Sequence, residues 1–324
     1  MSLSDMQVYN TEIQTNTIEL LDQMTQKFNA ASNGAIILNS NRNEGDFAKE
    51  AFWNNVSTAQ RRVNRYATNS AVSSTSLSQG ELVSVKVAGA FGPVLVEPSQ
   101  LQWLQRSPGE AITAISQGFA DALLADLLNT SLGCAVSAIE NQAALVNDVS
   151  AAGAITQNAL NGSHAKFGDM SGQLVADVMS GSTYHRLIDQ ALTNGNHLFS
   201  SGNVRVIDIL GKAVIVTDSP ALFQAKSDPN PAKDKVLSLV AGAIQVSDNN
   251  DMVTNMSTTN GKERIETTWQ ADYSFQVGLK GYAWDESNGG KSPTDALLFT
   301  GTNWDKAVAF DKHTAGTLAI GSAE

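Results

Sequence analysis

The sequence predicts an elongated α+β protein, and two long periodic segments support this prediction. Residues Arg264 to Lys280 alternate apolar and polar side chains, as in a β-strand with one packed and one solvent-facing side. Residues Ser107 to Asn141 carry apolar side chains at four-residue spacing, as in a long helix. At about 3.3 Å per strand residue and about 1.5 Å per helix residue, each segment spans roughly 50 Å. A helix and a strand of this length predict a flat, tile-shaped subunit rather than a typical enzyme.

Composition restricts the classes of function. The chain has 324 residues, enough for one large or two modest domains with their own cores. Charged residues make up only 16% of it, so much of the polar surface is uncharged and suited to burial against other protein. The formal net charge of −11 argues against a dedicated nucleic-acid-binding protein, which needs a basic surface. A protein that encloses nucleic acid without gripping it stays possible, and so does an ordinary acidic soluble protein.

Targeting signals and thiol chemistry are absent from the sequence. The first residues lack the basic and apolar regions of a secretory signal, and no apolar run is long enough to predict a membrane span. Cys134 is the single cysteine, so we expect no internal disulfide and no multi-thiolate metal site. It lies among apolar residues of the predicted long helix, where we interpret it as a core residue rather than a nucleophile. A reducing, cytosol-like compartment follows.

The N-terminal segment predicts an amphipathic helix from about Glu12 to Ala30. Its apolar stripe consists of Ile13, Leu20, Leu21, Met24 and Phe28. Turn-rich chain follows, and no neighbouring segment completes a helical bundle. We therefore interpret this helix as an arm that docks on its own subunit or on a neighbour.

The next segment predicts a projecting hairpin. Arg61, Arg62 and Arg65 form the densest basic cluster, and a low-complexity polar stretch from Thr68 to Gln79 follows. Valines then alternate with polar residues, and Gly92-Pro93 predicts a turn before a second short extended segment. The arginine cluster has two interpretations, a solvated face or a docking site for an acidic neighbour.

The long helix and the long strand flank a compact α/β unit. Ser107, Pro108 and Glu110 predict the start of the helix as cap, first residue and capping-box partner. The unit from 142 to 262 predicts helices at 174–179 and 184–192, and strands at 204–209, 213–216 and 236–246. The long strand follows, with apolar residues on one face. Its other face is dominated by the uncharged residues Thr268, Gln270, Ser274 and Gln276.

Candidate chemical sites are weak. His164, Lys166 and Asp169 share a loop that reads either as an acid/base or metal site or, more simply, as a polar loop. The stretch Asp248 to Asp251 carries oxygens that suit calcium, but it lacks the spacing of an EF-hand and predicts an exposed turn. No nucleophile, phosphate or zinc motif is present, and the other histidines are His185, His197 and His313. We therefore predict no catalytic, cofactor-binding or metal-binding residues, no cofactor and no enzyme activity.

The order of these parts resembles the major capsid protein of tailed double-stranded-DNA phages, the HK97-like fold. Four sequence segments carry the resemblance: Ser171–Leu192, Asn203–Ser219, Gly281–Asp285 and Thr302–Lys306. The resemblance implies an α+β capsid fold in five parts. These are an N-terminal arm with a helix (1–55), an E-loop (56–101), the P-domain spine helix (102–141), an inserted A-domain (142–262), and a long strand with a C-terminal return to the P-domain (263–324).

The resemblance also implies a structural function and its partners. Copies of the chain would assemble as pentamers and hexamers into an icosahedral head in the host cytoplasm, enclosing DNA without sequence-specific binding and without a membrane. The Met1 start and the short arm suggest a separate scaffolding protein, and a portal is expected. Lys86 lies in the implied E-loop without specific support for a crosslink.

Three alternatives stay open at this point. The first is an encapsulin-type bacterial compartment, which shares the fold. The second is a flagellin-like filament protein, which has a similar composition but needs long terminal heptad helices that are not seen here. The third is a hydrolase that uses His164 and Asp169.

Overall fold

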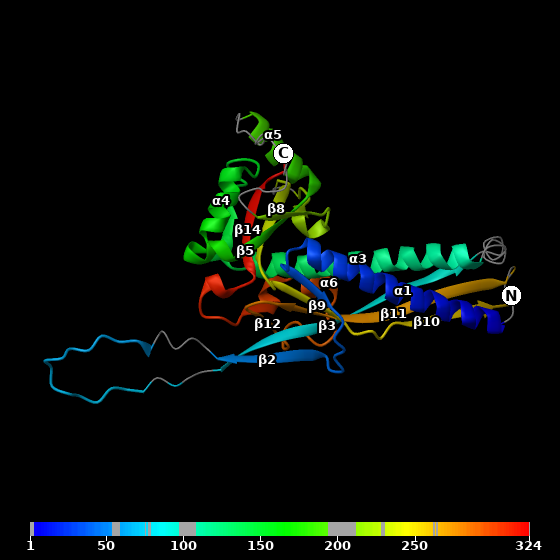
Figure 1. The fold of residues 1–324 in the computed structure, drawn as a ribbon, viewed down its shortest axis with the longest axis horizontal. Helices are drawn as coiled ribbons and strands as arrows, with labels where there is room; N and C mark the ends of the chain where they lie inside the picture. The colour runs from blue at the N-terminus through cyan, green and yellow to red at the C-terminus, as the bar shows by residue number, and fades with distance from the viewer. Residues whose placement is uncertain are drawn as a thin grey trace.

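A computed structural model describes residues 3–53, 59–74, 76, 79–96, 108–193, 212–227, 231–261, 263 and 265–323. Two six-stranded sheets organise this part of the chain, and a long helix packs against both. We call them the long sheet, which contains the predicted long strand, and the second sheet. Figure 1 shows the long sheet extended along the longest axis, with the second sheet standing to one side of it.

The long sheet has the strand order β1-β9-β11-β3-β2, and β10 pairs with β11. Its strands are β1 (Ile36–Asn39), β2 (Phe47–Trp53), β3 (Gln79–Val96), β9 (Ile244–Asp248), β10 (Val253–Thr259) and β11 (Glu266–Leu279). The central strand, β11, pairs with β3 along one edge and with β9 and β10 in succession along the other. Every pairing is antiparallel except that of β1 with β9.

The predicted long strand is confirmed, because β11 runs for 14 residues within the predicted range. Its apolar face is buried, with Trp269, Phe275 and Val277 at 5% exposure or less. The predicted solvent-facing side is wrong at one end, since Ser274 and Gln276 are buried as well. Both side chains are hydrogen-bonded within the subunit, so their burial leaves no polar group unsatisfied.

The predicted helices before and after the hairpin are also confirmed. The long helix α3 (Pro108–Glu140) has 33 residues, and the arm helix α1 (Leu3–Ala31) has 29. The predicted cap Ser107 lies outside the described residues. The arm docks on its own subunit: Ile13 is buried, and its carbonyl accepts a hydrogen bond from Ser116 of α3 (3.3 Å). Aromatic residues of α3 and the long sheet then join the two layers, with Phe119 4.1 Å from Trp269 between ring centroids.

The projecting hairpin is present, but its strands differ from those predicted. β2 pairs with β3, and residues between them extend as a loop far beyond the sheet (Figure 1). β3 continues through Gly92-Pro93, where we expected a turn. The register with β11 shifts there, between Trp269 and Ala271, so the break in pattern is a bulge within one strand.

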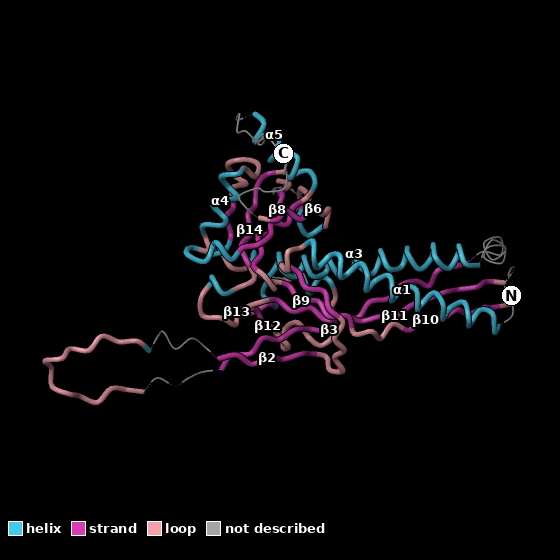
Figure 2. Tube along the Cα trace, in the orientation of Figure 1, coloured by secondary structure: helices cyan, strands magenta, loops and turns pink. Residues whose placement is uncertain are grey.

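The second sheet has the order β4-β14-β8-β5-β6, with β7 paired to β8. Its strands are β4 (Val146–Asp148), β5 (Leu174–Met179), β6 (Ala213–Val216), β7 (Phe223–Gln224), β8 (Lys233–Val240) and β14 (Gly316–Ser322). Helices α4 (Gln157–Ala165) and α5 (Gly181–Thr193) accompany it (Figure 2). The predictions of α5 and β6 are confirmed, and the strand predicted at 204–209 lies outside the described residues.

Two predictions within this unit are wrong. The segment 174–179 is the strand β5 rather than a helix, because burial on both sides leaves no alternation to distinguish the two. The single strand predicted at 236–246 is two strands in two sheets. β8 ends at Val240, Gly242 turns the chain at a φ of +66°, and β9 begins at Ile244 in the long sheet.

The two sheets do not divide the chain at residue 262, as the predicted domain boundary would require. β9 and β10 precede that residue and belong to the long sheet, whereas β14 follows it and belongs to the second sheet. The C-terminal segment was expected to return to the spine helix. It first forms β12 (Tyr282–Trp284), α6 (Asp295–Leu298) and β13 (Trp304–Lys306), and its last strand then pairs with β4 and β8.

Candidate functional site

His164 lies in α4 and points into the protein, where its Nε2 contacts Asp177 of β5 (3.0 Å) and Ser238 of β8 (3.1 Å). All three side chains are buried, so no substrate reaches them. A Ser-His-Asp catalytic triad uses both imidazole nitrogens, one for the serine and one for the aspartate. Here the same nitrogen serves both partners. The cluster therefore joins a helix and two strands and does not form a nucleophile.

The other residues of the predicted polar loop do not join His164. Lys166 is exposed, and Asp169 forms a surface ion pair with Lys312 (3.0 Å). That ion pair lowers the pKa of the Asp169 carboxyl. The region is helical up to Ala165, so the loop prediction is wrong for His164 itself. A hydrolase that uses His164 and Asp169 has no support in this geometry.

The remaining histidines and Cys134 do not form a site. His185 is exposed, His313 is half-buried, and His197 lies outside the described residues. Cys134 is completely buried, and burial raises the pKa of its thiol, which agrees with its interpretation as a core residue. Within the described ranges, no group of three His, Cys, Asp or Glu side chains is arranged to hold a metal ion.

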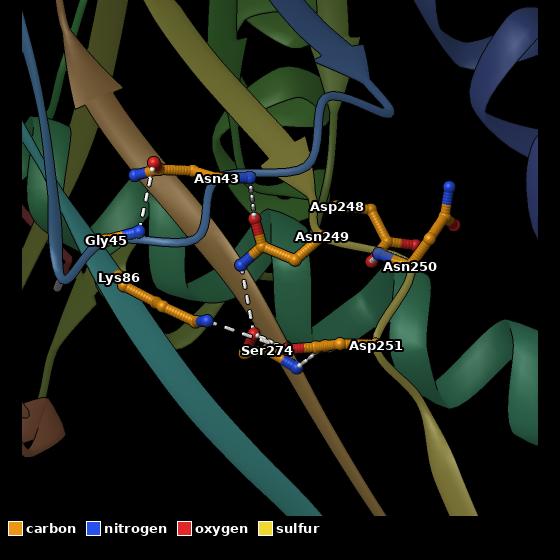
Figure 3. Close-up of polar contacts among 8 residues, drawn as sticks. All are labelled: Asn43, Gly45, Lys86, Asp248, Asn249, Asn250, Asp251 and Ser274. Carbon is orange, nitrogen blue, oxygen red and sulfur yellow. Dashed lines mark hydrogen bonds and ion pairs between the residues drawn. The ribbon is translucent and has the colours of Figure 1, made fainter.

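The predicted calcium-like turn at 248–251 is part of a hydrogen-bonded cluster (Figure 3). We call it the strand junction; its residues are Asn43, Gly45, Lys86, Asp248, Asn249, Asn250, Asp251 and Ser274. The buried Asn249 accepts a hydrogen bond from the backbone of Asn43 (3.1 Å) and donates one to Ser274 of β11 (2.9 Å). Asp251 accepts from the backbone N–H of Ser274 (2.9 Å) and lies 3.6 Å from Lys86 of β3. The junction thus bridges the gap between β9 and β10 along β11.

Electrostatics in the strand junction point to structure rather than ion binding. Burial is the main cause of a raised pKa at Asp248, and the neighbouring Asp251 adds to it. The expected exposed turn is wrong for Asn249, which is only 1% exposed. Its carboxamide oxygen accepts from Asn43 and its amide donates to Ser274, so the side chain serves to join chain segments.

The hairpin loop is the part of the described chain with the least contact to the rest of the subunit. Residues 59–74 are all exposed, and Tyr66 reaches 92% exposure. The loop also carries the arginine cluster, which the structure places at the projecting end of the hairpin (Figure 1). The loop is therefore accessible to other protein along its whole described length.

A groove of about 420 Å³ lies beside the C-terminal half of α3, and sequence reasoning missed it. We call it the spine groove. Its walls come from α3, from the segment 220–224, which includes β7, and from α6 with Phe299. These segments are distant in the sequence, and only the fold brings them together. No periodicity or motif signals such a surface.

Comparison with known proteins decides what this architecture is. The family model described as Major capsid protein 13-like matches residues 5–318. The chain belongs to this family. It is a subunit of a phage capsid shell, and its place is the capsid of the virion.

Solved structures support the HK97-like α+β fold of the capsid protein. A subunit of the cyanophage Pam1 capsid matches with a TM-score of 0.55 at 12% identity, over 89% of this chain and 88% of that chain. A chain of Mycobacterium phage Cain matches with a TM-score of 0.50 at 10% identity, over 89% and 87% of the two chains. Comparison with curated protein sequences gives no match.

For a capsid protein, the functional site is the surface that meets neighbouring copies. The family favours neither the encapsulin-type compartment nor the flagellin-like filament. One segment, Ile112–Glu140 of α3, is long and apolar enough to cross a membrane by length and composition, but two thirds of its apolar window is buried in the subunit. We therefore interpret it as the core helix of the capsid protein. The exposed hairpin loop and the spine groove are the main candidate contact surfaces.

Proposed function

We propose that the capsid protein assembles as pentamers and hexamers into an icosahedral head that encloses phage double-stranded DNA. The strongest support for this assembly is the exposure of the hairpin loop, whose exposed residues include Val63, Tyr66 and Val72. Within the described part of the subunit this loop packs against nothing, and ordering it costs conformational entropy. Overlap with a neighbouring subunit supplies the missing contacts.

Within this proposal, the parts of the chain take the roles of a capsid tile. The arm is α1, the E-loop is the β2–β3 hairpin, the P-domain is the long sheet with α3, and the A-domain is the second sheet with α4 and α5. The boundaries follow the sheets rather than residue 262, so β14 belongs to the A-domain. A-domains meet around the axes of the capsomers, and E-loops overlap neighbours.

The proposal includes the partners of the shell. The net charge of −11 repels DNA on average, so the head holds DNA without sequence-specific contacts. We further propose that a separate scaffolding protein and a portal take part, that assembly occurs in the host cytoplasm, and that the subunit has no enzymatic activity. The buried His164 cluster, which is inaccessible to a substrate, supports the last point.

Electron microscopy of the expressed protein tests the function. We expect closed particles when the chain is produced with the scaffolding protein of its own genome. A variant in which a Gly-Ser linker of equal length replaces residues 60–74 should keep the thermal unfolding midpoint of the subunit and lose the particles. A stable monomer at high concentration, with no particles in the presence of scaffold, would contradict the proposal.

A further inference from the structure

The hairpin loop has a charge opposite to that of the rest of the chain. Between Glu50 and Glu81 the sequence holds three of its 21 basic side chains and none of its 32 acidic ones. The three are Arg61, Arg62 and Arg65, and all are exposed. Within the described residues, no acidic side chain of the subunit forms an ion pair with any of them. The loop therefore presents an unneutralised positive charge at the end of an arm.

The spine groove has the opposite charge. Asp126, Glu140 and Asp295 line it, against one cation, Lys235, which is already paired with Glu140 (2.7 Å). Burial is the main cause of the raised pKa of Tyr273, and Asp126 and Asp295 both add to it. Asp126 accepts a hydrogen bond from the Tyr273 hydroxyl (2.6 Å), and among the described residues no cation forms an ion pair with Asp126 or Asp295.

The groove also has surfaces that suit an arginine-rich loop with apolar residues. The residues Phe223 and Phe299, which are 50% and 44% exposed, lie on its walls. A guanidinium group stacks on an aromatic face while it pairs with a carboxylate. Asn129 of α3 adds an amide that can bond to the backbone of an extended loop.

The loop cannot reach the groove of its own subunit. Figure 1 shows the hairpin projecting away from α3 and α6, which form the groove. We infer that the loop segment 61–66 of one copy binds in the spine groove of a second copy, with its arginines against Asp126 and Asp295. This inference rests on the proposed function and specifies which surfaces of two neighbouring subunits meet. It also explains why the loop is basic in an acidic protein, since opposite charges favour one register of docking over others.

Disulfide trapping in assembled particles tests the contact directly. The native Cys134 is buried, so introduced cysteines report alone. We expect the pair Arg62→Cys with Asn129→Cys to give a ladder of covalently linked subunits on a non-reducing gel, because a disulfide needs Cα atoms within about 7 Å. The matched control pairs Arg62→Cys with Asp305→Cys, an exposed acidic position on β13 outside the groove, and should give no ladder.

A charge exchange tests the recognition chemistry. We expect Arg65→Glu alone, and Asp295→Arg alone, to lower the yield of particles about tenfold, and the double variant to restore it. Particles without the 62–129 ladder, or a double variant no better than the single ones, would overturn the inference while leaving the proposed function intact. If the unsubstituted chain forms no particles, the proposed function fails, and the inference fails with it.

Discussion

Asn249 joins three chain segments that are distant in the sequence. Its carboxamide accepts from the backbone of Asn43, before the hairpin, and donates to Ser274 in the middle of β11. Because these groups are buried or half-buried, removing the amide leaves polar atoms without partners. The position therefore contributes to stability through hydrogen bonds rather than through apolar packing.

We expect Asn249→Ala to lower the free energy of unfolding of the subunit by about 1–3 kcal/mol. Chemical denaturation of the unassembled protein measures this change. The matched control is Asn255→Ala, at an exposed position on β10, which should change the same quantity by less than about 0.5 kcal/mol. Equal changes in the free energy of unfolding at the two positions would show that the hydrogen bonds of Asn249 in the strand junction do not stabilise the subunit.

We expect the contribution of Asp248 to the stability of the subunit to change with pH in the opposite direction from that of Asp169. Burial raises the pKa of Asp248, so its charged form opposes folding above the folded pKa, and stability is gained as pH falls through that value. Asp248→Asn should therefore raise the free energy of unfolding at pH 7 and lose this advantage as the pH falls. The carboxamide oxygen can still accept the hydrogen bond from the backbone of Asn250.

The contrasting variant is Asp169→Asn, where Lys312 lowers the pKa of the carboxyl. The stability contributed by that ion pair is present above the unfolded pKa and is lost as pH falls through the folded pKa. Thermal unfolding midpoints of both variants should be measured between about pH 3 and pH 7, where carboxylates titrate. They check the sign of the pH dependence at each position. A midpoint of Asp248→Asn below that of the unsubstituted protein at pH 7 would contradict the first.

At the scale of the element, two glycines in the interior of α3, Gly118 and Gly133, lie in different environments. Gly118 is exposed and has no atom near the position of an added methyl group, whereas the ring of Phe299 occupies that position at Gly133. Both lie inside the helix, where glycine costs about 1 kcal/mol relative to alanine. The second glycine is thus explained by a close approach of the C-terminal segment.

We expect Gly118→Ala to raise the free energy of unfolding by about 0.5–1 kcal/mol. The free energy of unfolding of Gly133→Ala should be lower than that of Gly118→Ala by at least about 1 kcal/mol, because the Phe299 ring must leave its contact with the helix. Urea denaturation of the two variants measures the difference. A gain at Gly133 equal to that at Gly118 would show that the ring moves at no cost.

Elements with one buried side were predictable from the sequence, and the others were not. β11, α1 and the N-terminal half of α3 each show a clear period because one face is more buried than the other, whereas the C-terminal half of α3 is buried on nearly all sides. β5 is buried on nearly every position, so its residues read equally well as a helix. Gly92-Pro93 is typical of a turn, but pairing with β11 on both sides keeps β3 extended. The spine groove and the partners of Asn249 are formed by segments that are distant in the sequence, so no local sequence pattern predicts them.

At the scale of the whole molecule, the C-terminal half of α3 connects the two sheets. Cys134, Ala135, Ala138 and Ile139 are fully buried there, in one core that includes residues of β9, β11, β8 and β14. Small side chains let both sheets approach the helix closely. We therefore expect the two sheets to unfold together in a single transition.

Ala138→Leu tests this coupling, because overpacking at a contact between helix and sheets costs about 1–3 kcal/mol. Hydrogen exchange should show protection falling by a similar factor for amides of β11 and of β14. Gln117→Leu, at an exposed position of the same helix, is the control and should leave protection of both sheets unchanged. Loss of protection in one sheet alone would show that the sheets are independent units.

The position of β14 has a consequence for synthesis of the protein. Residues Gly316–Ser322 form an inner strand of the second sheet, between β4 and β8, yet they are translated after every other strand of that sheet. At about 5–20 residues per second, the ribosome takes on the order of ten seconds to go from β5 to β14. Once β8 has been made, it lacks its partner β14 for the rest of that time, whereas the hairpin has already been made. A nascent chain thus exposes its hairpin before its second sheet is complete. The native subunit can form only after its last strand, β14, has been synthesised.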